Sequence, residues 1–311
     1  MPGQTGIKER GVTPMEVITA KSAGFCFGVK RAMEKVNEQI ALRDEAEGKT
    51  WDIYTYGPII HNEEVVKELE KRGVVAIREN DNIDGLISNA EISSHPARVI
   101  IRSHGVSREV QDMLLSKGFE VIDATCPFVK RIHNTVMKES SEGREIIIVG
   151  NPNHPEVEGI VGWCVNKPFV IESADEIGTI PFSDEKKYSI VAQTTFNHKK
   201  FKDIVEKITT IVYDVNVVDT ICNATYERQR ESKEIAAKVD AMIVIGDTHS
   251  SNSKKLFEIC REECENTHFI QTLDDLILEN TESVRLVGIT AGASTPNYII
   301  EEVQNYVRVD F

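Results

Sequence analysis

Three cysteines stand at nearly equal intervals along the chain, each in a similar local setting. Cys26, Cys126 and Cys222 are separated by 100 and 96 residues (126 − 26 and 222 − 126). Each follows an apolar, β-branched run and precedes a stretch that is typical of a helix with basic residues in its first turns. At the end of a strand and the start of a helix, backbone N–H groups and the helix dipole favour the thiolate. Three such positions predict one shared metal site.

Two further sets of polar residues repeat in the same order, which indicates a threefold internal repeat. After each cysteine an apolar run ends in a glycine (Gly57, Gly150 and Gly246), and a polar residue stands four positions later: His61, His154 and Ser250. A third apolar run in each unit also ends in polar residues, namely His104, then Thr194 with Thr195, then Ser294. Each unit therefore carries three strand-end loops, one with Cys and two with His, Thr or Ser.

The alternation of short apolar runs with amphipathic stretches predicts an α/β fold with mostly parallel sheets. The length of 311 residues suggests about two domains, but the repeat favours three small ones. In such sheets ligands bind beyond the carboxyl ends of the strands, so three lobes facing a pseudo-threefold axis would bring all nine loops to one cavity. We expect a flexible extension over 1–14 and lobes over 28–126, 127–218 and 219–311.

The amino-acid composition and the net charge argue against several classes of protein. The formal charge of −14 argues against general nucleic-acid binding, which needs a basic field. No run approaches the length of a membrane span, and no charged-then-apolar leader precedes the first predicted strand, so we expect a cytoplasmic protein. The six cysteines are then expected to be reduced thiols or metal ligands.

The three repeated thiolates suit either a zinc ion with an open position or a cubane iron–sulfur cluster with one iron free of protein ligands. Either would offer a Lewis-acid position to a substrate oxygen. Cys164, Cys260 and Cys264 have no repeat partners, and we expect them to be structural.

A second set of donors converges from the same loops and suits a phosphate or diphosphate. Its members are His61, His104, His154, Ser250, Ser251, Asn252 and Ser294. No P-loop and no G-x-G-x-x-G pattern is present, so a nucleotide is not indicated. Glu156 is the best proton donor, because a carboxyl enclosed in a cavity has a raised pKa, and Thr194 is its expected hydroxyl partner.

Nine short motifs, in order, resemble the hydroxymethylbutenyl diphosphate reductase family, also called LytB: GFCFGV, GPIIHN, SHGVS, DATCP, HPEVEG, QTT, DTICNAT, SSNS and TAGAS. The resemblance spans about residues 15 to 300. It implies a three-lobed α/β fold around a central 4Fe–4S cluster held by Cys26, Cys126 and Cys222, with the strand in 15–27 packed against the third lobe.

The resemblance also implies an activity, in which the fourth iron binds the substrate hydroxyl and the His, Ser and Asn set holds the diphosphate. Glu156 would supply the proton and Thr194 would orient the hydroxyl or a water. The products would be isopentenyl and dimethylallyl diphosphates, with electrons from ferredoxin or flavodoxin. One departure is GDTHSSNS, where many members have Gly and Asn at the places of Asp247 and His249.

Two alternatives remain at this point. The same three thiolates would suit a zinc hydrolase acting on a phosphorylated small molecule, which would be colourless where a cubane is brown. An iron–sulfur redox sensor is the other, although sensors usually carry a nucleic-acid or partner-binding module and no basic motif of that kind is present.

Overall fold

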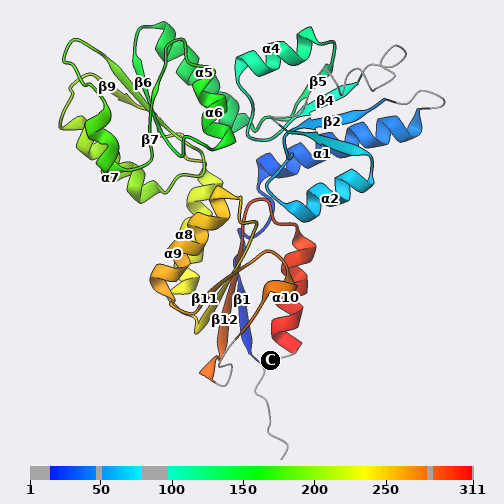
Figure 1. Ribbon diagram of the computed structural model, residues 1–311. Helices are drawn as coiled ribbons and strands as arrows, with labels where there is room; N and C mark the ends of the chain where they lie inside the picture. Colours follow the sequence, from blue (N-terminus) through cyan, green and yellow to red (C-terminus); the bar gives the residue numbers. More distant parts are fainter. Residues whose placement is uncertain (1–14, 47–50, 79–96, 279–282, 310–311) are drawn as a thin grey trace, which may run out of the picture.

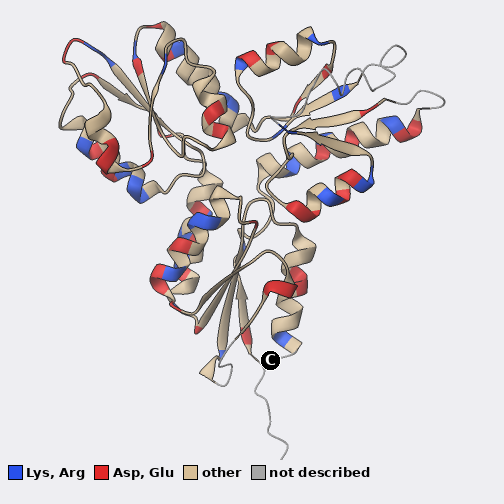
Figure 2. Cartoon of the chain, viewed as in Figure 1, with Lys and Arg blue, Asp and Glu red and all other residues tan. Residues whose placement is uncertain are grey.

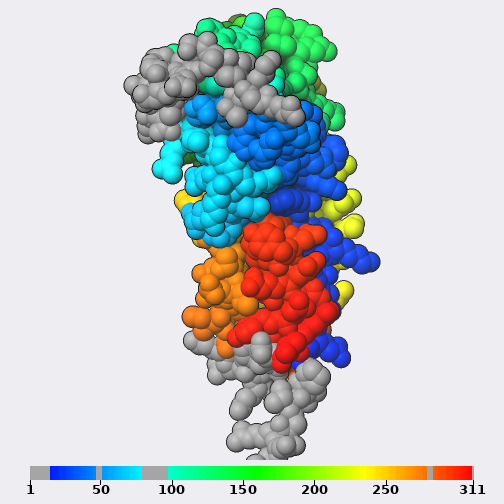
Figure 3. All heavy atoms as spheres, turned by 90° about the vertical axis from the view of Figure 1, so that its right-hand side faces the viewer, coloured from blue at the N-terminus to red at the C-terminus, as the bar shows by residue number. Residues whose placement is uncertain are grey.

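Three lobes surround a common centre in the computed structural model (Figure 1), which describes residues 15–46, 51–78, 97–278 and 283–309. The predicted extension over 1–14 lies outside these residues. Each lobe contains one four-stranded sheet, and all the strand pairs are parallel. Seen from the side, the molecule is thinner than it is wide (Figure 3). The prediction of three α/β lobes with parallel sheets is confirmed.

The first lobe has the strand order β3-β2-β4-β5. Its strands are β2 (Ile53–Tyr56), β3 (Val74–Ile77), β4 (Arg98–Ile101) and β5 (Glu120–Asp123), and its helices are α1 (Phe27–Glu45), α2 (Glu63–Lys71) and α4 (Arg108–Ser116). Apolar residues of α1 and α2 pack on one face of the sheet and those of α4 on the other. Asn62 begins α2 because its side chain accepts a hydrogen bond from the Val65 N–H group.

The second lobe repeats this arrangement with the order β7-β6-β8-β9. Its strands are β6 (Glu145–Val149), β7 (Phe169–Ile171), β8 (Tyr188–Ala192) and β9 (Val215–Val217), and its helices are α5 (Pro127–Ser141), α6 (Pro155–Val161), the 3-10 helix η1 (Ala174–Thr179) and α7 (His198–Thr209). Alternate residues of β6 point to opposite faces, Ile146 and Ile148 towards α5 and α6, Ile147 and Val149 towards α7.

The third lobe is completed by the N-terminal strand and has the order β11-β10-β12-β1. Its strands are β1 (Glu16–Thr19), β10 (Ala241–Ile245), β11 (Thr267–Ile270) and β12 (Leu286–Ala291), and its helices are α8 (Asn223–Ala236), α9 (Ser251–Glu263), the 3-10 helix η2 (Leu273–Asp275) and α10 (Asn297–Val309). Glu16 of β1 pairs with Leu286 of β12. The N-terminal strand therefore belongs to the third sheet, as the resemblance implied.

Each repeated cysteine lies where the chain crosses from one lobe to the next. Cys126 follows β5 of the first sheet and precedes α5 of the second lobe, and Cys222 and Cys26 make the two equivalent crossings. The backbone repeats as well, because each cysteine N–H group donates to a carbonyl of the third strand-end loop. The accepting residues are Ser103 for Cys126, Thr194 for Cys222 and Ala293 for Cys26. In this register Thr195, rather than Thr194, is equivalent to His104 and Ser294.

Two helices end before the helical apolar spacing of their sequence does. This spacing continues over 201–214, but α7 ends at Thr209 and the chain turns before β9, which pairs with β8 from Val215. The apolar spacing likewise continues over 253–266, but α9 ends at Glu263, since Cys264 has an extended conformation with φ −132°.

Charged side chains lie mainly on the helices, while the strands are largely uncharged (Figure 2). Within the described ranges, no helix combines the length and apolarity that crossing a membrane requires.

Candidate active site

One central cavity is lined by loops from all three lobes, at the carboxyl ends of the strands. The structure brings every predicted site residue to this cavity: Cys26, His61, His104, Cys126, His154, Glu156, Thr194, Cys222, Ser250, Ser251, Asn252 and Ser294. These side chains lie far apart in the sequence, so the cavity exists only when the three lobes are assembled.

The three cysteine side chains converge on one side of this cavity as free, partly exposed thiols. Gly28, in the first turn of α1, makes room for them. A Cβ atom at this position would lie 2.5 Å from the Cys126 Sγ atom and 4.0 Å from the Cys26 Sγ atom. The helix can therefore approach the thiols closely only because residue 28 has no side chain.

The N–H groups at the helix starts do favour the thiolate, as expected, but burial acts more strongly on the thiol pKa of Cys126 and Cys222 in the metal-free chain. Burial raises the pKa of the Cys126 thiol to about 11, although the N–H groups of Phe128 and Val129 act in the opposite direction. Burial also raises the pKa of Cys222. Desolvation outweighs the helix start here, so these thiols need a bound cation to release their protons near neutral pH.

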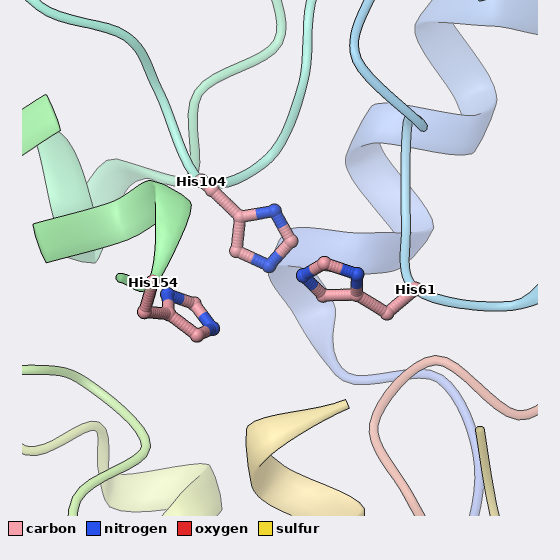
Figure 4. A group of neighbouring side chains, drawn as sticks. All are labelled: His61, His104 and His154. Atoms are coloured by element: carbon pink, nitrogen blue, oxygen red, sulfur yellow. The ribbon is translucent and has the colours of Figure 1, made fainter. Parts of the chain in front are cut away.

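Three imidazole rings face one another on the other side of the cavity (Figure 4). His61 and His104 come from the first lobe and His154 from the second, with ring centroids 4.6 to 5.8 Å apart. The His154 Nδ1 atom accepts a hydrogen bond from the Glu156 N–H group at 3.1 Å. The neutral ring therefore carries its proton on Nε2, which leaves Nε2–H as a donor.

Burial keeps these imidazoles neutral in the free protein. It lowers the pKa of His61 to about 4 and that of His154 to about 3, and it places the pKa of His104 well below the ordinary value. The positive charge of Arg102 lowers all three further. An anion between the rings would reverse this electrostatic effect and raise each pKa.

The third lobe contributes hydroxyl and amide donors from the start of α9. Ser250 is its N-cap and accepts from the Ser253 N–H group at 3.3 Å, while Ser251 and Asn252 form the first turn. Ser294, after β12, donates to the His61 carbonyl at 2.7 Å and so joins the third lobe to the first. The N-terminus of a helix of this length favours a negatively charged group.

Three buried polar atoms of this set have no hydrogen-bond partner in the described part of the chain: His61 Nε2, His104 Nδ1 and Asn252 Nδ2. Buried polar groups are normally satisfied, so atoms of this kind around one cavity indicate a ligand that supplies the partner.

The ring nitrogens of the three histidines lie within 4.8 Å of one another, a spacing that a metal ion could also use. The surroundings favour an anion instead. Arg102 places positive charge near all three rings and the start of α9 lines the same cavity, so both would repel a cation, whereas the negative charge of Asp247 acts on His61 alone.

Glu156 is 1% exposed, and both of its carboxylate oxygens face Thr194. Oε1 accepts from the Thr194 N–H group at 2.6 Å, and Oε2 is 2.7 Å from the Thr194 hydroxyl. Burial raises the pKa of Glu156, although the hydrogen bonds from Thr194 and the charge of Lys255 oppose it. The expected contact with Thr194 and the expected direction of the pKa shift are both present.

Several residues at or near the cavity were not predicted as site residues. Arg228 of α8 is 3% exposed and donates to the carbonyls of Ala291 and Gly24, which holds two loops of the third lobe together. Lys255 and Arg102 supply positive charge near Glu156 and the histidines. Arg102 directly precedes the SHG motif, which was a usable signal, whereas nothing in the sequence separates Arg228 from an exposed helical arginine.

Asp247 connects the first and third lobes beside this site. It is 4% exposed, and its carboxylate accepts from the Glu63 N–H group at 3.2 Å and from the His249 N–H group at 2.6 Å. Asp247, one of the two departures noted in the sequence, thus stabilises the start of α2 and its own loop.

The three cysteines without repeat partners lie outside the cavity. Cys260 and Cys264 are buried against the apolar core of the third lobe, and Cys164 packs against that of the second. Burial raises the pKa of Cys164 and Cys260 to about 12, so both thiols are protonated near neutral pH.

Comparison with known proteins gives consistent matches over nearly the whole chain. The family model described as "LytB protein" matches residues 17–308. Proteins named 4-hydroxy-3-methylbut-2-enyl diphosphate reductase are 44% identical in Caldanaerobacter subterraneus subsp. tengcongensis and 42% identical in Clostridioides difficile. Each match covers 94% of this chain, with 97% and 99% of the relative.

Two solved structures are also similar. One, titled as the structure of (E)-4-hydroxy-3-methyl-but-2-enyl diphosphate reductase, the terminal enzyme of the non-mevalonate pathway, is 41% identical with a TM-score of 0.66, and the match covers 94% of this chain and 99% of that one. The other, the E-1-hydroxy-2-methyl-but-2-enyl-4-diphosphate reductase from Plasmodium falciparum, is 30% identical with a TM-score of 0.82, covering 94% and 88%.

Proposed function

The chain belongs to the LytB family, and from this premise we propose that it is an oxidoreductase that converts 4-hydroxy-3-methylbut-2-enyl diphosphate to isopentenyl and dimethylallyl diphosphates. This is the last step of the non-mevalonate isoprenoid pathway. The observation that carries the proposal is one cavity that combines three thiols, a set of anion donors and a buried carboxyl.

The reaction is a reductive dehydroxylation. Two electrons and two protons enter, the C–O bond to the hydroxyl breaks, a C–H bond forms and water leaves. The site must therefore hold the diphosphate, place the hydroxyl near a source of electrons and supply a proton, because hydroxide is a poor leaving group.

The three thiols fit a 4Fe–4S cluster. Gly28 leaves room beside Cys126, all three cysteines are free, and no fourth cysteine of the described chain lines the cavity. Cys26, Cys126 and Cys222 would hold three irons and leave one without a protein ligand. When bound, such a cluster supplies one-electron reduction and a Lewis-acidic iron.

The remaining residues act on the substrate. His61, His104, His154 and the Ser250, Ser251, Asn252 and Ser294 donors hold the diphosphate, which takes up the unpartnered buried nitrogens. Glu156 delivers a proton to the departing hydroxyl, since burial favours its protonated form. Thr194 fixes the position of the Glu156 carboxyl through two hydrogen bonds and orients the hydroxyl or a water.

A zinc hydrolase would use the same thiols, and a redox sensor would use the same cluster. The relatives are named reductases, and these names argue against both the hydrolase and the sensor. A buried carboxyl and an anion site facing the thiols serve a reaction on a bound substrate, which a sensor does not need.

We also propose the electron donor of the enzyme, its location and the limits of its lobes. Electrons come from ferredoxin or flavodoxin, the location is the cytoplasm, and the lobes are 28–126, 127–218 and 219–311 with the strand of 15–27. The lobe limits rest on the three sheets, since each falls within one proposed lobe.

Turnover is the direct test. The anaerobically purified protein, supplied with 4-hydroxy-3-methylbut-2-enyl diphosphate and a reduced viologen, should release both five-carbon diphosphates. Release of inorganic phosphate or diphosphate without these products would support the hydrolase instead.

A further inference from the structure

A basic surface lies next to the cysteine side of the central cavity. A hollow of about 480 Å³ between α1 and α5 is lined by four cationic side chains and no acidic one: Arg31, Lys130, Arg131 and Lys138. The chain as a whole carries a formal charge of −14, so four cations around one hollow are unusual for this molecule. We call this surface the basic hollow.

Contacts hold the basic hollow against the thiol that begins α5. Thr125 and Pro127, which flank Cys126, line the hollow themselves. The Arg31 guanidinium donates to the Thr125 carbonyl at 3.0 Å. The hollow therefore lies on the outside of the loop whose inner side contributes Cys126 to the cavity.

No acidic residue offsets the cations of the basic hollow at the two helix starts beside it. Acidic residues are favoured in the first turn of a helix, and Glu63 and Glu64 begin α2 in this way. In contrast, α1 and α5 have no acid in their first turn, a feature that they share with α7, α8, α9 and α10. Acids are thus absent at the two helix starts beside the hollow.

Two exposed aromatic residues lie at the starts of the same two helices; neither lines the basic hollow, and Phe128 lines the central cavity. Phe27 is 64% exposed and Phe128 is 40% exposed, and they lie in the first turns of α1 and α5, which meet where Gly28 contacts Cys126. Exposed apolar groups bordered by charge are typical of a surface that a partner covers.

The cations are available to a partner. Lys130 pairs with Asp123, and Lys138 is 3.9 Å from Glu142, but both lysines are mostly exposed, so these ion pairs are weak and exchangeable. Arg131 has no acidic partner among the described residues.

We propose that the basic hollow is the docking site of a small acidic protein that delivers single electrons. This inference rests on the proposed function, because a reductive dehydroxylation consumes two electrons per turnover. Over most of its surface a chain this acidic would repel an acidic carrier, so the basic hollow would orient the encounter. Electron transfer falls steeply with distance, and docking here brings the carrier to the outer side of the Cys126 loop.

The cations have a competing explanation, in which they only offset the negative charge of a thiolate-bound cluster. The two explanations differ in what they affect. Docking changes the affinity for a protein carrier, whereas charge compensation changes cluster retention and turnover with every reductant.

The experiment compares two variants of the cluster-loaded protein, in each of which two cationic side chains are replaced by Glu. Arg131→Glu with Lys138→Glu alters the basic hollow. Lys202→Glu with Lys207→Glu makes the same change of net charge on exposed residues of α7 and serves as the matched control. The probe is a small acidic ferredoxin, with binding measured by calorimetry at low and high ionic strength.

We expect the hollow variant to bind the ferredoxin about tenfold more weakly at low salt and the control to stay close to the parent. High salt should reduce parent binding towards that of the variant. Iron content and turnover with reduced viologen should stay within twofold of the parent in both variants.

Ferredoxin binding that is absent in the parent, unchanged in the hollow variant or equally weakened in the control would overturn the docking site. A parallel loss of iron or of viologen turnover would favour charge compensation. If the parent binds ferredoxin through the hollow but does not reduce the substrate, the result supports the docking site and contradicts the proposed reaction.

Discussion

At the scale of single residues, Glu156 has the environment of a proton donor. It is almost fully buried, Thr194 contacts both of its oxygens, and its pKa is raised by desolvation. Glu158 lies in the same first turn of α6 but is exposed, so replacing it with Gln is a matched control for replacing Glu156 with Gln.

We predict that Glu156→Gln lowers turnover by roughly 10²-fold or more, the contribution of general acid catalysis, because the amide keeps the shape but cannot donate a carboxyl proton. Iron content and substrate affinity should stay near the parent values. Glu158→Gln should have nearly the turnover, iron content and substrate affinity of the parent. Steady-state turnover with reduced viologen at saturating substrate is the measurement. A rate within a few-fold of the parent would remove Glu156 from the mechanism.

The histidines make stability depend on pH. The pKa of His61 is about 4 in the folded protein and near 6.5 when unfolded, so the unfolded state binds the proton more readily. The folded state is therefore destabilised as the pH falls from about 6.5 towards 4, by up to about 1.4 kcal/mol per pH unit for each such histidine.

We predict that the melting temperature of the free protein falls over this window, and that His61→Asn gives a shallower fall. Inorganic diphosphate should flatten the parent curve, since a bound anion raises the histidine pKa values. Melting curves by circular dichroism at several pH values measure this. Equal slopes for the parent and His61→Asn would show that His61 is not buried in its neutral form.

At the scale of elements, the close approach of α1 to Cys126 depends on one missing side chain. Gly28→Ala is compatible with a helix but would place a Cβ atom 2.5 Å from the Cys126 Sγ atom, whereas Gly178 has no atom within 4 Å of the equivalent position. We predict that Gly28→Ala loses most of its iron while its circular dichroism stays native, and that Gly178→Ala keeps both. Full iron content in Gly28→Ala would mean that the thiols do not need this approach.

The sequence predicted the loops of the site better than the contacts between them. Cys26, Cys126 and Cys222 were recognisable because strand-end loops keep their spacing in a repeat, and parallel sheets bring such ends to one side. The role of Arg228 was not predictable, because its burial depends on carbonyls of Gly24 and Ala291 that reach it only in the folded chain.

The net pKa of the Cys126 thiol was not predictable for a related reason. A helix start is visible in the sequence, but the degree of burial at that start is set by packing between lobes. The pairing of β1 with β12 also brings together the two ends of the chain, and local patterns carry no signal for it.

At the scale of the whole molecule, three lobes with separate cores meet at the cavity. The cysteines lie at the three crossings between lobes, so a metal centre bound by all three would join the lobes to one another. Ligands that bind only the folded state raise its stability.

We predict that anaerobic removal of the metal centre by a chelator lowers the main calorimetric transition by several degrees and broadens it, while far-UV circular dichroism remains native. The sheets should survive because each lobe keeps its own core. Identical transitions before and after metal removal would show that the centre does not link the lobes.

In the proposed enzyme the three repeated cysteines hold an iron–sulfur cluster at the site of a reductase. The most direct measurement is the iron, sulfide and zinc content of the anaerobically purified protein, with Cys126→Ser as the test variant and Cys164→Ser as its matched control. We predict a brown parent with about four iron and four sulfide per chain, a colourless Cys126→Ser and an unchanged Cys164→Ser. A colourless parent with about one zinc per chain, or a fully loaded Cys126→Ser, would contradict the claim.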